Sequence, residues 1–288
     1  MDWTARRDSY RAILEGDRCV HPGSVCDPIS ARIAEELGFE TGMFAGSVAS
    51  QAVLGGPDII LVTLTEFAEQ AYRINRAART IPLMVDADHG YGNALNVRRT
   101  VEELETAGIS GLTIEDTELP QAYGTLGSTS LIPIEEGVAK IKAALDARQD
   151  SRLVVIARTG AAQITDINDA VARAKAYEAA GADAMFFSGI KTKEEVEAAA
   201  GSVSIPTMLG GSGSAPVSTE ELGRLGVRVS LQGHYPFMAA VQATYDTLKA
   251  LRDGTAPEEL TGYADGATMK RLMRDADYKS WMKDGLGG

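Results

Sequence analysis

The sequence predicts a (β/α)8 barrel of the TIM type with an extra C-terminal helical segment, and three observations point to it. Eight apolar runs with strand character alternate with segments whose apolar residues recur at helical spacing. The connections are short, and 288 residues is a normal length for this fold. The runs are nearly continuous in apolar residues, which suits parallel strands covered on both faces. A doubly wound open sheet is the alternative, but no Gly-x-Gly-x-x-Gly follows the first run.

The eight expected strands are apolar runs that end in glycine or polar residues. They cover residues 19–27, 41–47, 81–88, 111–116, 153–159, 184–189, 205–210 and 227–233. Helical spacing predicts helices over residues 29–37, 64–78, 94–107, 134–147, 164–180, 193–199, 218–225 and 237–251. A last helix is expected over residues 268–283, after a polar break.

The ends of these helices carry the expected local signals. Asn93 follows a glycine-rich loop as an N-cap does, and Pro133 precedes two glutamates that suit the first turn of a helix. Gly108, Gly181 and Gly226 each follow a helical run, as glycines at the C′ position do. No linker divides the chain, so we expect one barrel domain over residues 1–288, with residues 255–288 as a helical tail.

Composition excludes several classes of protein. A net charge of −12 argues against binding to nucleic acid or to an anionic membrane surface. No apolar run is long enough to span a membrane, and the N-terminus lacks the apolar stretch of a signal peptide. Cys19 and Cys26 are the only cysteines, which indicates the reducing cytoplasm rather than a disulfide framework.

Asp86 and Asp88 stand where the apolar run 81–85 passes into a glycine-rich loop. The carboxyl ends of parallel strands are where α/β barrels place their chemistry. Residues two apart share a face of an extended segment, so the two carboxylates repel unless a cation or a proton lies between them. Mg²⁺ suits such oxygens and keeps several waters, and Mn²⁺ suits the same ligands. The alternative is a pair of loop aspartates that cap the next helix.

Two further strand ends carry polar side chains. Glu115 and Asp116 end one run, and Arg158 and Thr159 end the next. A guanidinium beside a metal-binding cluster suits a small anionic substrate, because its fork binds a carboxylate through two hydrogen bonds. The alternative is a salt bridge between Glu115 and Arg158 under a loop. Asp116 points away from Glu115 on an extended strand, so we expect it to support the site rather than to contact a metal.

Six segments in the right order, each at a strand end, carry a resemblance to a known family. They are residues 24–32, 46–50, 85–96, 112–116, 157–159 and 232–234. On these motifs the chain resembles the isocitrate lyase/phosphoenolpyruvate mutase superfamily and, within it, the oxaloacetate decarboxylase branch. The resemblance covers nearly all of the chain, from about residue 11 to the last helix.

The resemblance implies a metal site. Asp88 would bind Mg²⁺ directly, and Asp86 and Glu115 would hold metal waters, with Asp86 also counted among the catalytic residues. It further implies a homotetramer built as a dimer of dimers, in which the last helix is exchanged between subunits. The tail over residues 268–283 is a candidate for the exchanged element.

The resemblance also implies a substrate site for a 2-keto acid. Ser50, with Gly46 and Ser47, would hold the substrate carboxylate at the end of the second strand. Arg158 would form an ion pair with the substrate, and His234, at the end of the eighth strand, would form a hydrogen bond with it. Arg158 and His234 are therefore expected to be both catalytic and substrate-binding residues.

The reaction that these parts favour is decarboxylation of oxaloacetate, or of a close 2-keto diacid, to pyruvate and CO₂ through a metal-stabilised enolate. The alternative is a carbon–carbon lyase of the retro-aldol or retro-Claisen type, acting on a substituted malate or a 2-methylisocitrate-like acid. Lyases of this superfamily that cleave isocitrate-type acids carry a cysteine in the loop after strand four, and residues 120–129 here have no cysteine, lysine or histidine. A non-catalytic protein on the same scaffold is a third interpretation.

Two departures from the family pattern concern substrate size. Gly160 stands where the family usually has a polar side chain, and residues 210–214 are small where bulkier residues are expected. The functional hypothesis is a roomier pocket for a C3-substituted 2-keto diacid, and the alternative is a tight or flexible loop.

Four other polar residues near the strand ends have competing interpretations. His21 is expected to be structural, and Asp27 is expected to cap the next helix. Asp58 either holds a metal water or the substrate, or caps a turn, and His89 either lines the site or packs beside it.

Overall fold

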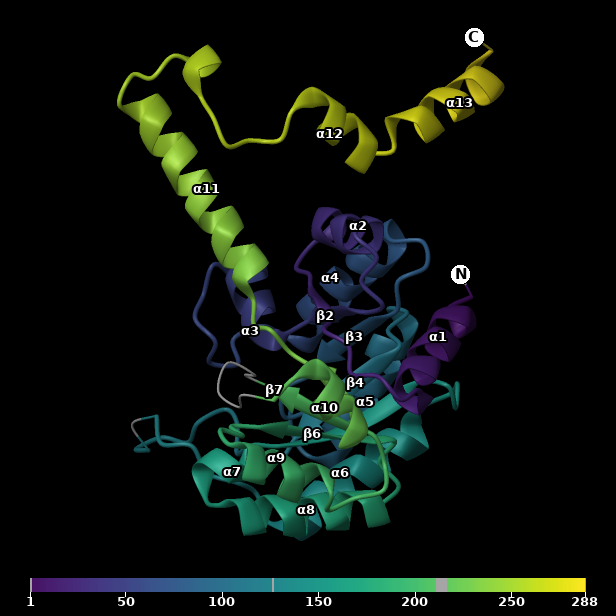
Figure 1. The fold of residues 1–288 in the computed structure, drawn as a ribbon, viewed down its shortest axis with the longest axis vertical. Coiled ribbons are helices and arrows are strands. Elements are labelled where there is room, and N and C mark those ends of the chain that lie inside the picture. Colours follow the sequence, from purple (N-terminus) through teal and green to yellow (C-terminus); the bar gives the residue numbers. More distant parts are fainter. Residues whose placement is uncertain (1, 126, 211–216, 288) are drawn as a thin grey trace. The chain divides into compact units, whose positions relative to one another are not determined.

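The computed structural model describes residues 2–125, 127–210 and 217–287. Eight strands form one parallel sheet in the order β1 to β8 (Figure 1). A parallel bridge between Val20 and Val229 joins the segment before β1 to β8, with backbone N–O distances of 2.9 and 3.0 Å. The sheet thus closes on itself, which confirms the predicted barrel. The strands are β1 Gly23–Ser24, β2 Gly42–Phe44, β3 Leu83–Asp86, β4 Gly111–Glu115, β5 Val154–Thr159, β6 Ala184–Ser188, β7 Thr207–Gly210 and β8 Val227–Ser230.

Helices alternate with these strands in chain order (Figure 1). Before and through the first half of the barrel they are α1 Thr4–Glu15, α2 Pro28–Glu36, α3 Gly46–Ala49, the π-helix η1 Ser50–Leu54, α4 Leu64–Ala77, α5 Ala94–Thr106 and α6 Ile134–Ala147. The later ones are α7 Ala161–Ile164, α8 Ile167–Ala179, α9 Lys193–Ala200, α10 Thr219–Arg224, α11 Tyr235–Arg252, the short 3-10 helix η2 Pro257–Glu259, α12 Gly266–Leu272 and α13 Asp275–Leu286.

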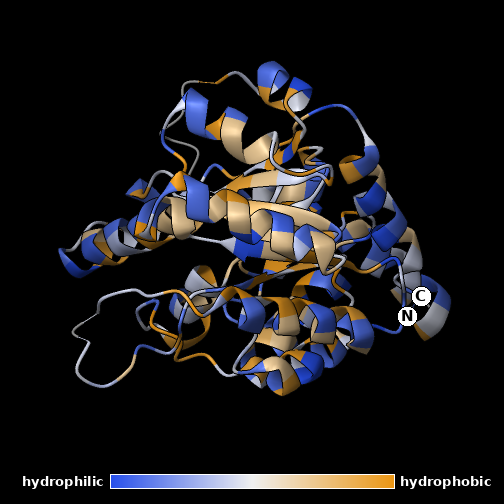
Figure 2. Cartoon of the chain, turned by 90° about the horizontal axis from the view of Figure 1, so that it is seen from below, coloured by the Kyte–Doolittle hydropathy of each residue, from blue (hydrophilic) through white to orange (hydrophobic). Residues whose placement is uncertain are grey.

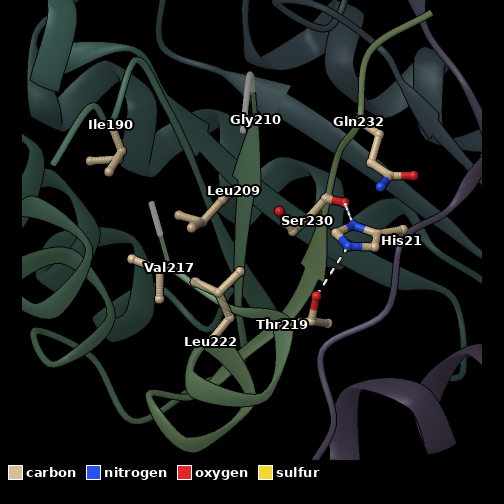
Figure 3. A pocket seen from close by; sticks show the side chains of 9 residues that line it. All are labelled: His21, Ile190, Leu209, Gly210, Val217, Thr219, Leu222, Ser230 and Gln232. Atoms are coloured by element: carbon tan, nitrogen blue, oxygen red, sulfur yellow. Dashed lines mark hydrogen bonds between the residues drawn. The ribbon is translucent and has the colours of Figure 1, made fainter. Parts of the chain in front are cut away.

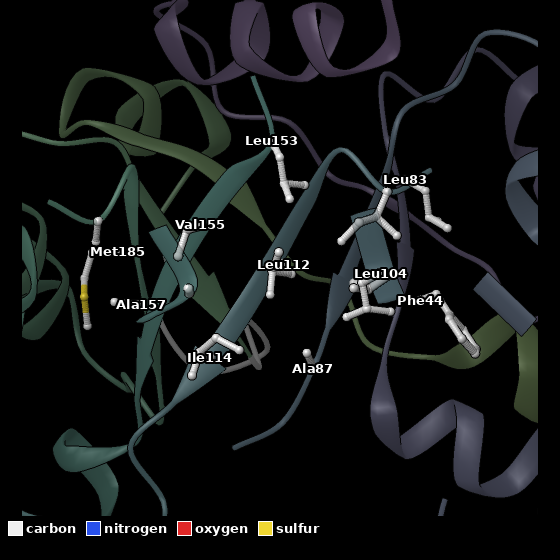
Figure 4. Packing of buried hydrophobic residues seen from close by; sticks show 14 of the residues in the cluster. Phe44, Leu83, Ala87, Leu104, Leu112, Ile114, Leu153, Val155, Ala157 and Met185 are labelled. Atoms are coloured by element: carbon white, nitrogen blue, oxygen red, sulfur yellow. The ribbon is translucent and has the colours of Figure 1, made fainter. Parts of the chain in front are cut away.

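The main core lies between the strands and the helices around them. Leu112 and Ile114 of β4 and Val155 of β5 belong to one buried cluster with Leu104 of α5 (Figure 4). The strands are mostly hydrophobic along their length, whereas the helices alternate between hydrophobic and hydrophilic residues (Figure 2). Burial on both faces explains why the strands read as continuous apolar runs in the sequence.

Helix α1 was not expected from the sequence. Its Tyr10 is fully buried, and its hydroxyl lies 3.3 Å from the sulfur of Met84 and 3.8 Å from that of Met208. A Cβ atom on Gly111, the first residue of β4, would lie 2.6 Å from the Tyr10 ring. The tyrosine therefore fills the barrel interior at the end where the strands begin, away from the polar strand ends.

The structure shortens most of the predicted strands, and three predicted elements differ most clearly from the structure. The first strand is reduced to two residues, plus the bridge at Val20. The predicted helix 164–180 starts later, as α8 at Ile167, because the Asp166 side chain accepts hydrogen bonds from the backbone of Asn168 and Asp169; the short helix α7 ends at Ile164. The predicted tail helix is two helices, which are separated where Arg274 has a φ of +58°.

The predicted helix ends are confirmed. The Asn93 side chain accepts hydrogen bonds from the backbone of Leu95 and Asn96. Gly108, Gly181 and Gly226 have φ values of +86°, +99° and +92°, the left-handed conformation that closes a helix.

A glutamate recurs near the end of the main helix in the first, third and fifth strand–helix units, in α2, α5 and α8. Glu35 accepts backbone hydrogen bonds from residues 79–81, at 2.8, 2.5 and 3.2 Å. Glu105 accepts them from residues 149 and 150, at 2.8 and 2.6 Å. Glu178 accepts them from residues 204 and 205, at 2.7 and 3.3 Å. Each of these alternate-unit glutamates ties a helix to the turn before the strand two positions further on, namely β3, β5 and β7.

Replacing Glu178 with glutamine is expected to destabilise the protein by about 2 kcal/mol at pH 7, since a neutral amide oxygen accepts these hydrogen bonds more weakly than a carboxylate. The hydroxyl and backbone N–H of Ser204 lower the pKa of Glu178. A carboxylate whose pKa is lower in the folded protein than in the unfolded chain stabilises the folded protein at pH values above the unfolded-state pKa. This stabilisation is lost as the pH falls through the folded-state pKa. The difference in free energy of unfolding between wild type and Glu178→Gln, measured with urea, should therefore become smaller below about pH 4. Glu15→Gln, on the exposed end of α1, is the control, and a difference that does not change with pH would contradict the prediction.

The chain forms two compact units, Met1–Gly233 and His234–Gly288. The first holds the eight strands. The second holds α11, α12 and α13, and α11 has no buried residue. Among the described residues, no helix is both long and apolar enough to cross a membrane.

Candidate active site

Three polar side chains meet at the carboxyl ends of adjacent strands. Asp86 is the last residue of β3, Glu115 is the last residue of β4, and the sheet register pairs Glu115 directly with Arg158 of β5. Arg158 Nη1 donates to Asp86 Oδ2, and its Nε lies 3.3 Å from Glu115 Oε2. Thr113 Oγ1 donates to the other oxygen of Asp86 at 2.6 Å. The salt bridge considered from the sequence is therefore present, as part of a larger cluster.

Asp88 completes this cluster from the loop after β3. A Cβ atom on Gly46 would lie 2.4 Å from Asp88 Oδ2, so the carboxylate rests directly against that glycine. Burial raises the pKa of Asp88 well above its usual range, and the nearby charges of Asp86 and Glu115 add to this effect. The pKa of Glu115 is also raised by burial, against the opposing effect of Arg158.

The loop that carries Asp88 is strained and firmly held. Asp88 and Tyr91 have φ values of +47° and +62°, which residues other than glycine seldom adopt. Three successive carbonyl groups, of residues 88, 89 and 90, accept hydrogen bonds from different elements. The donors are the Glu115 backbone at 2.8 Å, Lys140 Nζ at 3.0 Å and Thr100 Oγ1 at 2.9 Å. These contacts fix the carboxylate of Asp88 before any ligand arrives.

Lys140 and Thr100 are site-supporting residues that the sequence analysis missed. Lys140 is 3% exposed, and burial lowers the pKa of its amine. The one available signal was its position on the inner face of a predicted helix, where a lysine needs a polar partner. Nothing in the sequence identified that partner as the carbonyl of His89.

Asp116 faces away from this cluster, in the direction that strand alternation predicts. Its Oδ2 accepts hydrogen bonds from Thr159 at 2.9 Å, Tyr177 at 2.8 Å and Arg173 at 3.1 Å. These contacts link β4 to β5 and to α8. Asp116 therefore supports the strand end that presents Glu115.

The predicted carboxylate-binding residues follow β2. Gly46 and Ser47 begin α3, and Ser50 begins η1 and is 3% exposed. The structure thus places Gly46 against Asp88, as described above. His234 immediately precedes α11 and is the first residue of the second unit.

His21 and Asp27 are used by the fold. His21 Nδ1 lies 2.7 Å from the carbonyl of Ser230, and its Nε2 lies 3.3 Å from Thr219 Oγ1 (Figure 3). These residues line a cavity of about 180 Å³ whose lining includes none of the cluster's carboxylates. Asp27 caps α2 by accepting a hydrogen bond from Ser30 at 2.7 Å.

The donor set fits a hydrated divalent cation. Asp86, Asp88 and Glu115 are close enough to influence each other's charge, and Asp58 also raises the pKa of Asp88, while Arg158 is the cation paired with the cluster. The excess of buried negative charge is what a divalent ion would neutralise. Across residues 2–125, 127–210 and 217–287, no three acidic, histidine or cysteine side chains are grouped closely enough to hold a metal ion. An ion held by one carboxylate and otherwise through water suits that spacing.

The glycine at the end of β7 has a packing role. A Cβ atom on Gly210 would lie 2.7 Å from two atoms of the Phe186 ring, so the space belongs to that ring rather than to a substrate. At Gly160, a Cβ atom would lie 3.3 Å from Ile164 Cδ1. The small residues at positions 211–214, which the size hypothesis also used, lie outside the described residues.

A family model described as phosphoenolpyruvate phosphomutase matches residues 13–252, most of the chain. The chain belongs to the PEP mutase/isocitrate lyase superfamily. It is therefore an enzyme, as the sequence predicted.

Superfamily members resemble the chain along its whole length. It is 57% identical to a protein named oxaloacetate decarboxylase from Bradyrhizobium sp. (strain ORS 278), over 100% of this chain and 99% of the relative. A structure of oxaloacetate acetylhydrolase with the inhibitor 3,3-difluorooxalacetate superposes with a TM-score of 0.86 at 30% identity, covering 99% and 98% of the two chains. A structure of phosphonopyruvate hydrolase with oxalate and Mg²⁺ superposes with a TM-score of 0.85 at 30% identity, covering 98% and 99%.

Proposed function

We propose that this enzyme is a Mg²⁺-dependent oxaloacetate decarboxylase that releases pyruvate and CO₂. The observation that carries the proposal is the cluster of Asp86, Asp88, Glu115 and Arg158 at the carboxyl end of the barrel, in a chain 57% identical to a protein of that name. Asp88 would contact the ion, and Asp86 and Glu115 would hold its waters. When bound, the ion supplies Lewis-acid stabilisation of negative charge on the 2-keto oxygen.

The chain's own residues would bind and orient the substrate. Ser50 and the backbone of Gly46 and Ser47 would hold the carboxylate next to the keto group, and Arg158 and His234 would contact the rest of the anion. The bond between C3 and C4 breaks, and its electron pair moves toward the C2 oxygen while CO₂ leaves. A proton added at C3 then gives pyruvate. The fixed charge of Arg158 favours this charge movement more strongly in a buried site than it would in water.

Besides the substrate, the proposed partners are further copies of this chain, which would assemble as a homotetramer. Along α11, Tyr235, Met238, Val241, Tyr245 and Leu248 recur every three or four residues and are 53–71% exposed. An exposed apolar stripe of this length is typical of a helix that packs against another chain. It also suggests α11 as an element exchanged between subunits, in addition to the predicted tail. The free thiols Cys19 and Cys26 support the proposed cytoplasmic location.

Purified protein is expected to convert oxaloacetate to pyruvate with Mg²⁺, and to lose this activity when a chelator is added. Pyruvate formation would be followed with a coupled assay, and the rate with Mg²⁺ alone would be subtracted because the free ion also promotes decarboxylation. Addition of excess Mg²⁺ after chelation should restore the rate. No turnover above the Mg²⁺ background would contradict the proposal and favour the carbon–carbon lyase alternative, with substituted malates and 2-methylisocitrate as the next substrates.

A further inference from the structure

We infer that Phe186 and Gly210 are positioning residues that together hold the guanidinium of Arg158 in place for an anionic substrate. The inference rests on the proposed function, in which Arg158 meets that anion. Neither residue belongs to the motifs that identified the superfamily.

The aromatic ring of Phe186 lies under the guanidinium group of Arg158. The register of β5 and β6 pairs the two residues directly, so their side chains leave the sheet on the same side. The guanidinium carbon lies 5.2 Å from the centroid of the Phe186 ring, and Phe186 is 2% exposed. A guanidinium over the face of a buried aromatic ring is attracted by the ring quadrupole, and the attraction is stronger when both groups are out of water.

The Phe186 ring adds to the contacts that two carboxylates make with Arg158. Asp86 and Glu115 hold the edge of its guanidinium through Nη1 and Nε, as described above. The ring of Phe186 lies under the guanidinium carbon and so limits movement of the guanidinium toward the ring. If the ring moved, the side chain could tilt without breaking the carboxylate contacts, and its remaining N–H groups would point elsewhere.

Gly210 makes this ring position possible. The registers of β6 and β7 pair Gly210 with Ser188, two residues after Phe186, so all three side-chain directions point to one face. A Cβ atom at position 210 would lie 2.7 Å from both Cε2 and Cζ of the Phe186 ring, closer than real atoms approach. The φ of Gly210 is not in the left-handed region, so space rather than backbone conformation requires the glycine here. Even alanine would have to displace the ring.

A double-mutant cycle tests the inference. Gly210→Ala alone is expected to raise the KM for oxaloacetate and the Kd for oxalate about tenfold, with kcat changed by less than about threefold, because binding geometry is lost. Phe186→Leu should have a similar effect. In the Phe186→Leu background, Gly210→Ala should change KM and Kd less than about twofold, since the smaller leucine leaves room for the added methyl group. Gly266→Ala, which meets no atom within 4 Å, is the control.

The readouts separate the failure of the inference from that of the proposed function. Equal effects of Gly210→Ala in the two backgrounds would overturn the inference, because the glycine would then act independently of the ring. If wild type binds oxalate but does not turn over oxaloacetate, the proposed function fails. The double-mutant cycle in the Kd for oxalate, measured by calorimetry, still tests the inference. If wild type binds neither anion, Arg158 does not meet an anionic ligand and the inference is wrong. Urea unfolding of the four proteins of the cycle and of Gly266→Ala shows whether each variant is folded.

Discussion

Asp88→Ala is expected to reduce oxaloacetate turnover at least about a thousandfold and to abolish tight binding of Mn²⁺, used as a spectroscopic substitute for Mg²⁺. Asp88 is the carboxylate that the strained loop holds in place, and it rests directly against Gly46. Electron paramagnetic resonance of free Mn²⁺ measures the binding directly, apart from activity.

The folded protein should survive this substitution. Burial and the charges of Asp86 and Glu115 oppose the ionised form of Asp88, so removing it takes away a repulsive charge from the metal-free protein. We therefore expect an unfolding midpoint in urea equal to or above that of wild type. Asp146→Ala removes an exposed carboxylate of α6 and is the matched control. Wild-type Mn²⁺ binding by Asp88→Ala would show that the metal site lies elsewhere.

Arg158→Met is expected to lower kcat/KM for oxaloacetate by about a thousandfold and also to destabilise the protein. The arginine is the cation in contact with Asp86 and Glu115, which are 8% and 7% exposed. Removing one partner of a buried ion pair leaves uncompensated charge and typically costs about 3–5 kcal/mol. Steady-state kinetics and urea unfolding measure the two effects.

Arg158→Lys distinguishes charge from geometry at this position. Lysine keeps the positive charge but cannot contact both carboxylates with a planar fork, so it should recover much of the stability and only part of kcat/KM. Arg152→Met, which removes a half-exposed arginine two residues before β5, is the control. If Arg158→Lys matched wild type in kcat/KM, the fork geometry of Arg158 would be irrelevant to catalysis.

The parts that the sequence predicted are those with a signal within a few residues. An apolar run followed by Asp86 and Asp88 indicates a strand that ends in charged residues, and this signal does not depend on the rest of the chain. The glycines after helices work in the same way, because the left-handed conformation is a local requirement. The order of such signals along the chain was enough to predict the barrel and the cluster at one end of it.

The missed parts depend on residues that meet only in the folded chain. Tyr10 enters the barrel from a short helix whose sequence gives no sign of its partners, Met84 and Met208. Gly210 appeared to be a space-making residue for a substrate because the ring that fills its space, Phe186, comes from another strand. Periodicity shows which side of an element is buried, but it does not show which side chain from elsewhere fills the space.

The alternate-unit glutamates Glu35, Glu105 and Glu178 have a consequence for how the barrel is made during synthesis. Each carboxylate finds its backbone partners 26 to 46 residues later in the chain. A ribosome-bound segment that ends after one strand and its helix therefore leaves that helix end without its turn, and the contact is complete only when a second strand, its helix and the next turn have also been made. Each of these turns leads directly into the strand with which the next such segment begins, namely β3 or β5, or into β7. This continuity favours all-or-none assembly from β1 to β7 over stepwise addition of single units, and it makes a half-barrel intermediate a poor stopping point.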